Sequence, residues 1–252
     1  MENISQKFSR YILASGSPRR IEMMRQHGID PLILPAAIEE NIPPRHDMYE
    51  TVMYLALKKA KWVENAYLAR SAGRSADDAD AEFCGAADTV DAKRCDAADN
   101  ADTECRGAEA PISASAPVII AADTIVYADE IMGKPADPED GFRMLSKLRG
   151  GMHYVATGVA LVEAGMQNAR VFTEVTKVYF KDYTDEELCA YLATDEAYDK
   201  AGGYAIQGAF AKYIDHIEGD YNNVVGFPWD RIQQELPLLA KCSPRHGQAP
   251  QG

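Results

Sequence analysis

The stretch Ser15-Gly16-Ser17-Pro18-Arg19-Arg20 follows the apolar run Tyr11-Ile12-Leu13-Ala14 and leads into a helical pattern at Ile21. This order predicts a strand, a tight turn and the start of a helix. Ser17 is expected to cap the helix, and Pro18 suits its first position because proline has the required φ and needs no N–H partner there. Free backbone N–H groups beside two arginines favour a phosphate or polyphosphate as ligand. The alternative is an ordinary capped helix with two solvated arginines.

The chain has 252 residues, of which 46% are hydrophobic, and a formal net charge of -13. A chain of this length and composition can bury a substantial core. Its negative charge argues against nucleic acid or an anionic membrane as a partner, since both would repel it. No apolar run reaches roughly 18 residues and the N-terminus shows no signal-peptide pattern, so we expect a soluble cytoplasmic protein. The scattered cysteines, odd in number and without a C-x-x-C pair, favour free thiols: Cys84, Cys95, Cys105, Cys189 and Cys242.

A long helical pattern from Asp47 to about Arg70 carries an apolar stripe at spacings of three and four. Lys59 falls inside that stripe. Because a buried ammonium without a partner is costly, we expect Lys59 to contact a ligand or a carboxylate; the alternative is a stem packed on the core with its head in water. Before this helix, a short strand predicted at 31–35 leads into a loop with Glu39 and Glu40, an acidic pair that is ordinary on a protein surface.

The composition changes sharply between residues 71 and 116, where large aliphatic residues nearly vanish and Ala, Asp, Gly and Ser dominate. Such a segment buries too little apolar surface to offset the entropy lost on ordering. We therefore expect a disordered or loosely ordered acidic insertion. The last residues, 242–252, are interpreted as a polar tail.

The apolar run Pro117-Val118-Ile119-Ile120 predicts a central strand buried on both faces, and Ala121-Ala122-Asp123-Thr124 follows it. Ligands of α/β sheets bind beyond the carboxyl ends of such strands. Asp123 is therefore a candidate for metal coordination or water activation. The alternative is a strand-end carboxylate that caps a turn.

Two later segments carry further candidates. Gly133-Lys134-Pro135 lacks the upstream glycine of a Walker A loop, so Lys134 stays a candidate cation for a phosphate chain. Between Asp199 and Ala209, three glycines suggest backbone close to a ligand, and Gln207 offers the donor and acceptor that a base edge requires. His153 begins a predicted strand, where histidine is more often structural than catalytic.

The remaining patterns predict helices and strands between these candidates. They are a hairpin of strands at 125–127 and 131–132, a helix at 138–148, antiparallel strands at 153–163 and 170–181, a helix with a capping box at Thr184 and Glu187, a strand at 213–217, a loop at 221–228 and a final helix.

Several separate motifs occur in order along the chain. They are Leu13-Ala14-Ser15-Gly16-Ser17-Pro18-Arg19-Arg20, Ala122-Asp123-Thr124, Gly133-Lys134-Pro135, His153 with Thr157-Gly158-Val159, Asp199-Lys200-Ala201-Gly202 with Ile206-Gln207-Gly208, and Asn223-Val224-Val225-Gly226. Together they resemble the Maf family of nucleoside triphosphate pyrophosphatases, over nearly the whole chain outside the insertion.

The resemblance implies a single α/β domain over 1–252 with a Maf/ITPase-like, two-lobed fold: a mixed twisted sheet, flanking helices and a central cleft, usually in a homodimer. It also implies hydrolysis of a nucleoside triphosphate to the monophosphate and pyrophosphate with a divalent cation, Mg²⁺ or Mn²⁺. Glu40 and Asp123 would hold the metal, and Asp123 would be the catalytic base. The residues implied to bind phosphate are Ser15, Ser17, Arg19, Arg20, Lys59 and Lys134.

The motifs that begin at Asp199 and Ile206 resemble the branch of the family that acts on dTTP and UTP. In that branch Arg19, Thr124 and Gln207 would occupy the specificity positions, and the substrate would be dTTP, UTP or a modified pyrimidine nucleotide. The chain departs from the pattern in its insertion and at Gly203-Tyr204-Ala205, where the family often has Ala-Tyr-Gly. The alternatives are the same fold acting on a methylated purine triphosphate, and a nucleotide-binding regulator of cell division without turnover.

Overall fold

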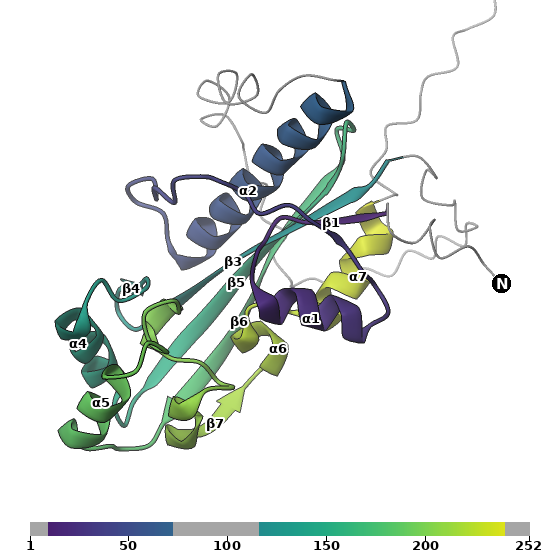
Figure 1. Ribbon diagram of the computed structural model, residues 1–252. Coiled ribbons are helices and arrows are strands. Elements are labelled where there is room, and N and C mark those ends of the chain that lie inside the picture. Colours follow the sequence, from purple (N-terminus) through teal and green to yellow (C-terminus); the bar gives the residue numbers. More distant parts are fainter. Residues whose placement is uncertain (1–9, 73–115, 240–252) are drawn as a thin grey trace, which may run out of the picture.

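The computed structural model describes residues 10–72 and 116–239 of the chain (Figure 1). The predicted acidic insertion, apart from its edges at 71–72 and 116, and the predicted polar tail lie outside the described residues. The strands are β1 (Tyr11–Leu13), β2 (Leu32–Ile33), β3 (Val118–Tyr127), β4 (Ile131–Met132), β5 (Met152–Glu163), β6 (Ala169–Phe180) and β7 (Ile214–Glu218). The helices are α1 (Pro18–Gln26), α2 (Met48–Ser71), α4 (Pro138–Leu148), α5 (Asp185–Leu192), α6 (Tyr221–Val225) and α7 (Trp229–Leu239), with short 3₁₀ turns η3 (Ala201–Gly203) and η4 (Ala209–Tyr213).

The strands of this part of the chain form one mixed sheet in the order β2-β1-β3-β5-β6-β7, with β4 paired to β3. β1 runs parallel to β2 and β3, whereas β3, β5, β6 and β7 pair antiparallel. Figure 1 shows α2 on one side of the sheet and α1, α6 and α7 on the other, with α4 and α5 at the far end of the long strands. The expected mixed α/β sheet with flanking helices is confirmed.

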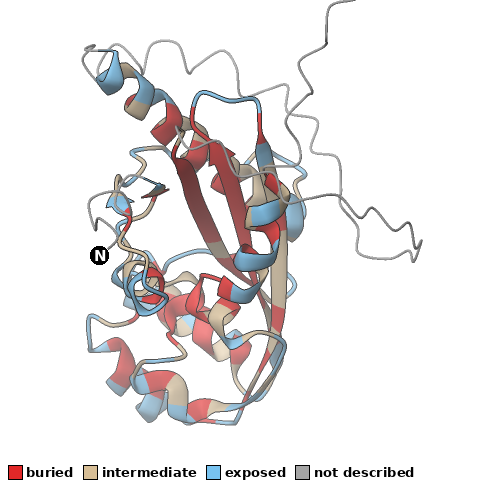
Figure 2. Ribbon diagram, turned by 90° about the vertical axis from the view of Figure 1, so that its right-hand side faces the viewer, coloured by how far each residue is buried: buried red, intermediate tan, exposed pale blue. Residues whose placement is uncertain are grey.

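The side-chain alternation of β3 divides the upper core between the two faces of the sheet. Ile119 and Ala121 pack with the apolar face of α2, whereas Val118 and Ile120 pack with α1 and α7. A further apolar cluster joins the other end of the long strands to α4 and α5, and its members include Val126, Val155, Val178, Leu145 and Leu188. Figure 2 shows the buried residues concentrated along the central strands and the inner faces of the helices.

The predicted helices and hairpins largely agree with the structure. The helix predicted at 138–148 is α4 with the same bounds, and the predicted antiparallel pair is β5 with β6. Thr184 and Glu187 form the predicted capping box of α5. None of the described helices combines the length and the apolar content that crossing a membrane requires. Among the described residues, Cys189 is exposed and has a free thiol, as predicted.

Two of the predicted boundaries are wrong. The strand predicted to end near Ile120 continues through Asp123 to Tyr127, because β3 loses its partner β1 after Ile120 but keeps its ladder with β5. Asp123 therefore lies inside a strand, opposite Gly158, and just beyond the carboxyl end of β1. The predicted loop at 221–228 contains the short helix α6, which the Asp220 side chain caps by accepting from the Asn222 N–H at 2.8 Å.

Helix α2 approaches β5 at Gly158 without room for a side chain. A Cβ on Gly158 would lie 2.2 Å from the carbonyl oxygen of Val52, so only glycine fits this close approach. Val52 and Lys59 are two helical turns apart on the same face of α2. The contact at Gly158 therefore sets how deeply Lys59 reaches across the sheet.

His153 is fully buried in β5, away from the cleft described below. Its Nε2 lies 2.6 Å from the Tyr204 hydroxyl, and its ring meets the ring of Phe180 edge-on. Burial lowers the pKa of His153 to about 3. These surroundings agree with the structural role that the sequence favoured.

We expect His153 to make the protein less stable in acid. Its pKa is about 3 in the folded protein, against 6.5 for an ordinary histidine, so between these values the unfolded chain binds the extra proton. This contribution to stability is intact above pH 6.5 and is lost as the pH falls toward 3, by up to about 1.4 kcal/mol per pH unit. Urea unfolding at a series of pH values measures the slope.

The variant His153→Gln keeps a hydrogen-bonding group for Tyr204 but does not titrate, and it should have a shallower slope between pH 6.5 and 4. His216→Gln, at an exposed histidine, is the control. Equal slopes in wild type and His153→Gln would contradict the assignment.

Candidate active site

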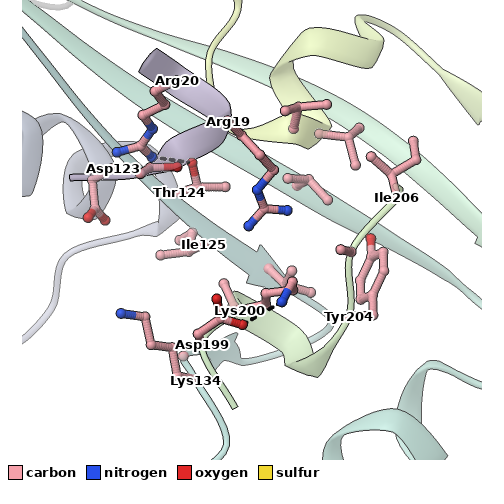
Figure 3. Close-up of a pocket in the computed structure, with 18 of the residues that line it drawn as sticks. Arg19, Arg20, Asp123, Thr124, Ile125, Lys134, Asp199, Lys200, Tyr204 and Ile206 are labelled. Carbon is pink, nitrogen blue, oxygen red and sulfur yellow. Dashed lines mark hydrogen bonds and ion pairs between the residues drawn. The ribbon is translucent and has the colours of Figure 1, made fainter. Parts of the chain in front are cut away.

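A cleft of about 930 Å³ opens where the turn after β1, the middle of β3 and the segment 196–208 meet (Figure 3). This volume is within the range of small-molecule sites, about 300 to 1,000 Å³. The structure brings every site residue predicted from the sequence into its lining: Ser15, Ser17, Arg19, Arg20, Glu40, Lys59, Asp123, Thr124, Lys134 and Gln207.

Lys59 joins the two predicted metal-binding carboxylates. Its Nζ lies 2.6 Å from Glu40 Oε1 and 2.5 Å from Asp123 Oδ1. The side chains of Lys59 and Asp123 are only 14% and 9% exposed, whereas that of Glu40 is 50% exposed. The prediction that Lys59 contacts a ligand or a carboxylate is therefore confirmed for carboxylates.

The charge of Lys59 also acts on Glu40. Partial burial raises the pKa of this carboxyl, but the hydrogen bond and the positive charge of Lys59 outweigh burial, so the pKa of Glu40 is below its ordinary value. Two carboxylates thus meet at one point, where the ammonium shows that a cation is accommodated between them. Oxygen donors of this kind, completed by phosphate oxygens and water, fit a small divalent cation such as Mg²⁺.

Arg20 is held by the protein instead of being solvated. Its Nε donates to the Gly226 carbonyl at 2.8 Å, and its NH1 donates to the Ala122 carbonyl at 2.7 Å and to Ser15 Oγ at 3.2 Å. Its NH2 donates to Thr124 Oγ1 at 3.2 Å, the dashed line at the top of Figure 3. Burial lowers the pKa of Arg20, and the charge of Asp123 opposes that shift. Arg20 therefore ties the turn after β1 to β3 and to the end of α6.

The predicted cap at Ser17 is wrong. Ser17 occupies the N-cap position of α1 with Pro18 behind it, but its side chain makes no capping hydrogen bond. Its own N–H donates to Ser15 Oγ at 3.2 Å. The Ser17 hydroxyl therefore leaves the backbone N–H groups at the start of α1 available, which is the arrangement that helix N-termini use for anions.

Arg19 and Lys134 differ from Arg20, because the side chain of neither forms a hydrogen bond or ion pair with another residue in the described ranges. Arg19 projects from the start of α1 into the cleft, and Lys134 lies on the loop after β4 (Figure 3). These free guanidinium and ammonium groups, together with the open N–H groups at the start of α1, make the cleft suitable for a phosphate chain.

The segment 196–208 forms another wall of the cleft. Gln207 is exposed, and within the described residues its amide has no protein partner. The hydrogen bonding of Thr124 is more restricted. Its Oγ1 lies 3.0 Å from Thr157 Oγ1, and Thr157 already donates its hydroxyl hydrogen to the Asn223 carbonyl. Thr124 is therefore the donor in the hydrogen bond between the two threonines. Toward a ligand, Thr124 can therefore act only as an acceptor.

Some residues of the site have only a weak signal in the sequence. Glu196 lines the cleft, but it lies in a stretch without periodicity, and only its nearness to the motif at Asp199 points to it. Thr157 and Asn223 belong to motifs of the resemblance, yet their contacts with Thr124 need the folded sheet. Gly226 contributes the backbone carbonyl that accepts from Arg20 Nε, and the residue type does not predict a backbone contact of this kind.

Comparison with known proteins adds independent findings. The family model described as Maf-like protein matches residues 10–238. The dTTP/UTP pyrophosphatase of Agathobacter rectalis is 38% identical over 234 residues, which cover 92% of this chain and 98% of that protein. Those of Caldicellulosiruptor bescii and Geobacter metallireducens are 35% and 37% identical, and they cover 91% and 92% of this chain and 94% and 96% of their own lengths. With a family match over nearly all described residues and relatives aligned over more than nine-tenths of this chain, this chain belongs to the Maf family.

Proposed function

We propose that this protein is a nucleoside triphosphate pyrophosphatase that hydrolyses dTTP and UTP to the monophosphate and pyrophosphate. The observation that carries the proposal is the meeting of Glu40 and Asp123 at Lys59 in a cleft that also holds the unpaired cations Arg19 and Lys134. A pair of carboxylates next to a phosphate-binding surface suits metal-assisted hydrolysis of a phosphoanhydride. The names of the relatives agree with this activity.

The proposed cofactor is a divalent cation, Mg²⁺ or Mn²⁺, held by Glu40 and Asp123. Within 10–72 and 116–239, no three His, Cys, Asp or Glu side chains gather as a complete metal cage. Two carboxylates suffice for Mg²⁺, which usually takes its remaining ligands from substrate phosphates and water. When bound, the cation would withdraw charge from the phosphoryl oxygens and from the departing pyrophosphate.

The protein's own residues supply the other parts of the reaction. Asp123 accepts a proton from a water molecule whose oxygen attacks the α-phosphorus, and the bond between that phosphorus and the bridging oxygen breaks to release pyrophosphate. Lys59 contacts Oδ1 of Asp123, and in the described residues Oδ2 has no side-chain partner. Arg19, Lys134 and the N-terminus of α1 stabilise the charge that collects on pyrophosphate.

We also propose that the protein acts as a homodimer in the cytoplasm, on nucleotides and not on nucleic acid. The net charge of -13 supports the last point, because a polyanion would be repelled. Nucleoside triphosphates are cytoplasmic metabolites, which supports the location.

The test is pyrophosphate release from a panel of triphosphates in the presence of Mg²⁺. We expect dTTP and UTP to have the highest kcat/KM in the panel. A higher kcat/KM for a methylated purine triphosphate would assign the fold to that substrate instead. Tight nucleotide binding without any pyrophosphate release would favour a regulator without turnover. Chelation of the divalent cation should abolish pyrophosphate release.

The variant Gln207→Ala should lose preference for pyrimidines. Its amide can pair with the donors and acceptors of a uracil or thymine edge, and a lost hydrogen bond of this kind costs roughly 10-fold to 100-fold in kcat/KM. The kcat/KM for UTP should fall toward that for GTP, while inorganic tripolyphosphate binds as before. Gln233→Ala, at an exposed position of α7, is the control. An unchanged ratio of UTP to GTP would remove Gln207 from specificity.

A further inference from the structure

Glu196 lines the cleft from the loop between α5 and η3. Both oxygens of its carboxylate accept from the backbone N–H of Ala209, at 3.0 and 3.2 Å. Ala209 follows Gln207 by two residues. The carboxylate therefore holds the segment that carries the amide proposed to read the base.

Gly208 makes room for this contact. A Cβ on Gly208 would lie 1.6 Å from Glu196 Oε1, so the carboxylate lies where any other residue would place its side chain. The φ of Gly208 is -103°, which every residue adopts easily, so the conformation of the backbone does not require glycine here. The requirement comes from the space that the Glu196 carboxylate fills.

The backbone of Glu196 is held by a second contact. Its carbonyl oxygen accepts from Lys200 Nζ at 2.7 Å, and the same ammonium is paired with Asp199 (Figure 3 shows this pair). Glu196 thus links two parts of the cleft wall: 199–200 before η3 and 208–209 after it. Gln207 lies directly beside the second of these attachments.

We propose that Glu196 is a positioning residue for base selection, which rests on the proposed function. It acts by holding the segment 207–209 in place through the Ala209 N–H. Loss of this contact leaves the Ala209 N–H without its partner and lets Gln207 sample orientations that no longer match a pyrimidine edge. Binding of phosphate alone does not depend on it.

The experiment compares Glu196→Ala and Glu196→Gln with the neighbouring control Asp195→Asn. Asp195 is exposed, and the described structure gives its side chain no hydrogen bond, so the control removes the same charge one residue away. We expect Glu196→Ala to lower kcat/KM for UTP by roughly tenfold or more and to reduce the ratio of UTP to GTP. Glu196→Gln keeps one acceptor oxygen for Ala209 and should restore most of that ratio.

Binding measurements separate positioning from a general loss of structure. The Kd of UMP should rise in Glu196→Ala, while the Kd of inorganic tripolyphosphate stays as in wild type. Gly208→Ala should reproduce this pattern, because its methyl group would displace the carboxylate. An equal loss for UTP and GTP, equal weakening of UMP and tripolyphosphate, or the same effect in Asp195→Asn would overturn the proposal.

The same binding data distinguish this inference from the proposed function. A wild type that binds UMP but releases no pyrophosphate would refute the proposed enzymatic activity. The Kd of UMP in wild type and in Glu196→Ala would still test the role of Glu196. A wild type that binds tripolyphosphate but not UMP would overturn the role of Glu196 in base selection.

Discussion

Replacing Asp123 by asparagine is expected to lower kcat for pyrophosphate release by roughly a thousandfold while the Kd of UMP changes little. The amide has nearly the shape of the carboxylate, so it fits the same buried position in β3. It cannot accept the proton of the attacking water, and it removes one of the two charges that meet at Lys59. Single-turnover measurement of pyrophosphate release, together with equilibrium binding of UMP, measures both quantities.

Asp230→Asn is the matched control for this variant, because Asp230 is exposed at the start of α7 and does not line the cleft. It should keep full activity. Titration with Mn²⁺ gives a reading that does not depend on turnover, and Asp123→Asn should bind this ion more weakly than wild type. Full activity in Asp123→Asn would refute the assignment of Asp123 as the base.

Replacing Gly158 by alanine is expected to destabilise the protein and to lower its activity together. The new Cβ would lie 2.2 Å from the carbonyl oxygen of Val52 and 2.8 Å from the N of Met53. These are backbone atoms that cannot rotate away, so α2 or β5 must shift, at a cost of about 1 to 3 kcal/mol or more. A shift of α2 also draws Lys59 away from Asp123, which is part of the sheet opposite Gly158.

Urea unfolding and pyrophosphate release would both be measured on this variant. Gly151→Ala is the control, since a Cβ there has ordinary contacts at 3.6 Å or more and Gly151 lies outside the cleft lining. Wild-type stability and activity in Gly158→Ala would show that the close contact with Gly158 does not fix the position of α2 against β5.

The local elements were the most predictable part of the fold. Helix α4 has an Asp137 cap, a proline at its start and a strong apolar stripe, and the sequence predicted its bounds correctly. Strand β3 was predicted too short, because its apolar run stops before Asp123 while its pairing does not. A strand continues as long as a neighbour supplies hydrogen bonds, and that neighbour, β5, is about 35 residues away in the sequence.

For the site, residue identities were predictable and contacts were not. Charged residue types and motifs pointed to Arg19, Lys59 and Asp123, which all line the cleft. The different situations of Arg19 and Arg20 follow from which carbonyl groups lie within reach, and those come from β3 and from the end of α6. Two neighbouring residues of one type are indistinguishable until the chain has folded.

The long strands β3, β5 and β6 each contribute to the apolar clusters at both ends of the sheet. They are continuous over ten, twelve and twelve residues, and they pair with one another along most of that length. In the described chain the two halves of the molecule are therefore joined by a continuous β-sheet and not by a flexible hinge. A large rotation of one half against the other would break the hydrogen bonds between these strands. We therefore expect a nucleotide to bind in a preformed cleft, with adjustments confined to side chains and surface loops.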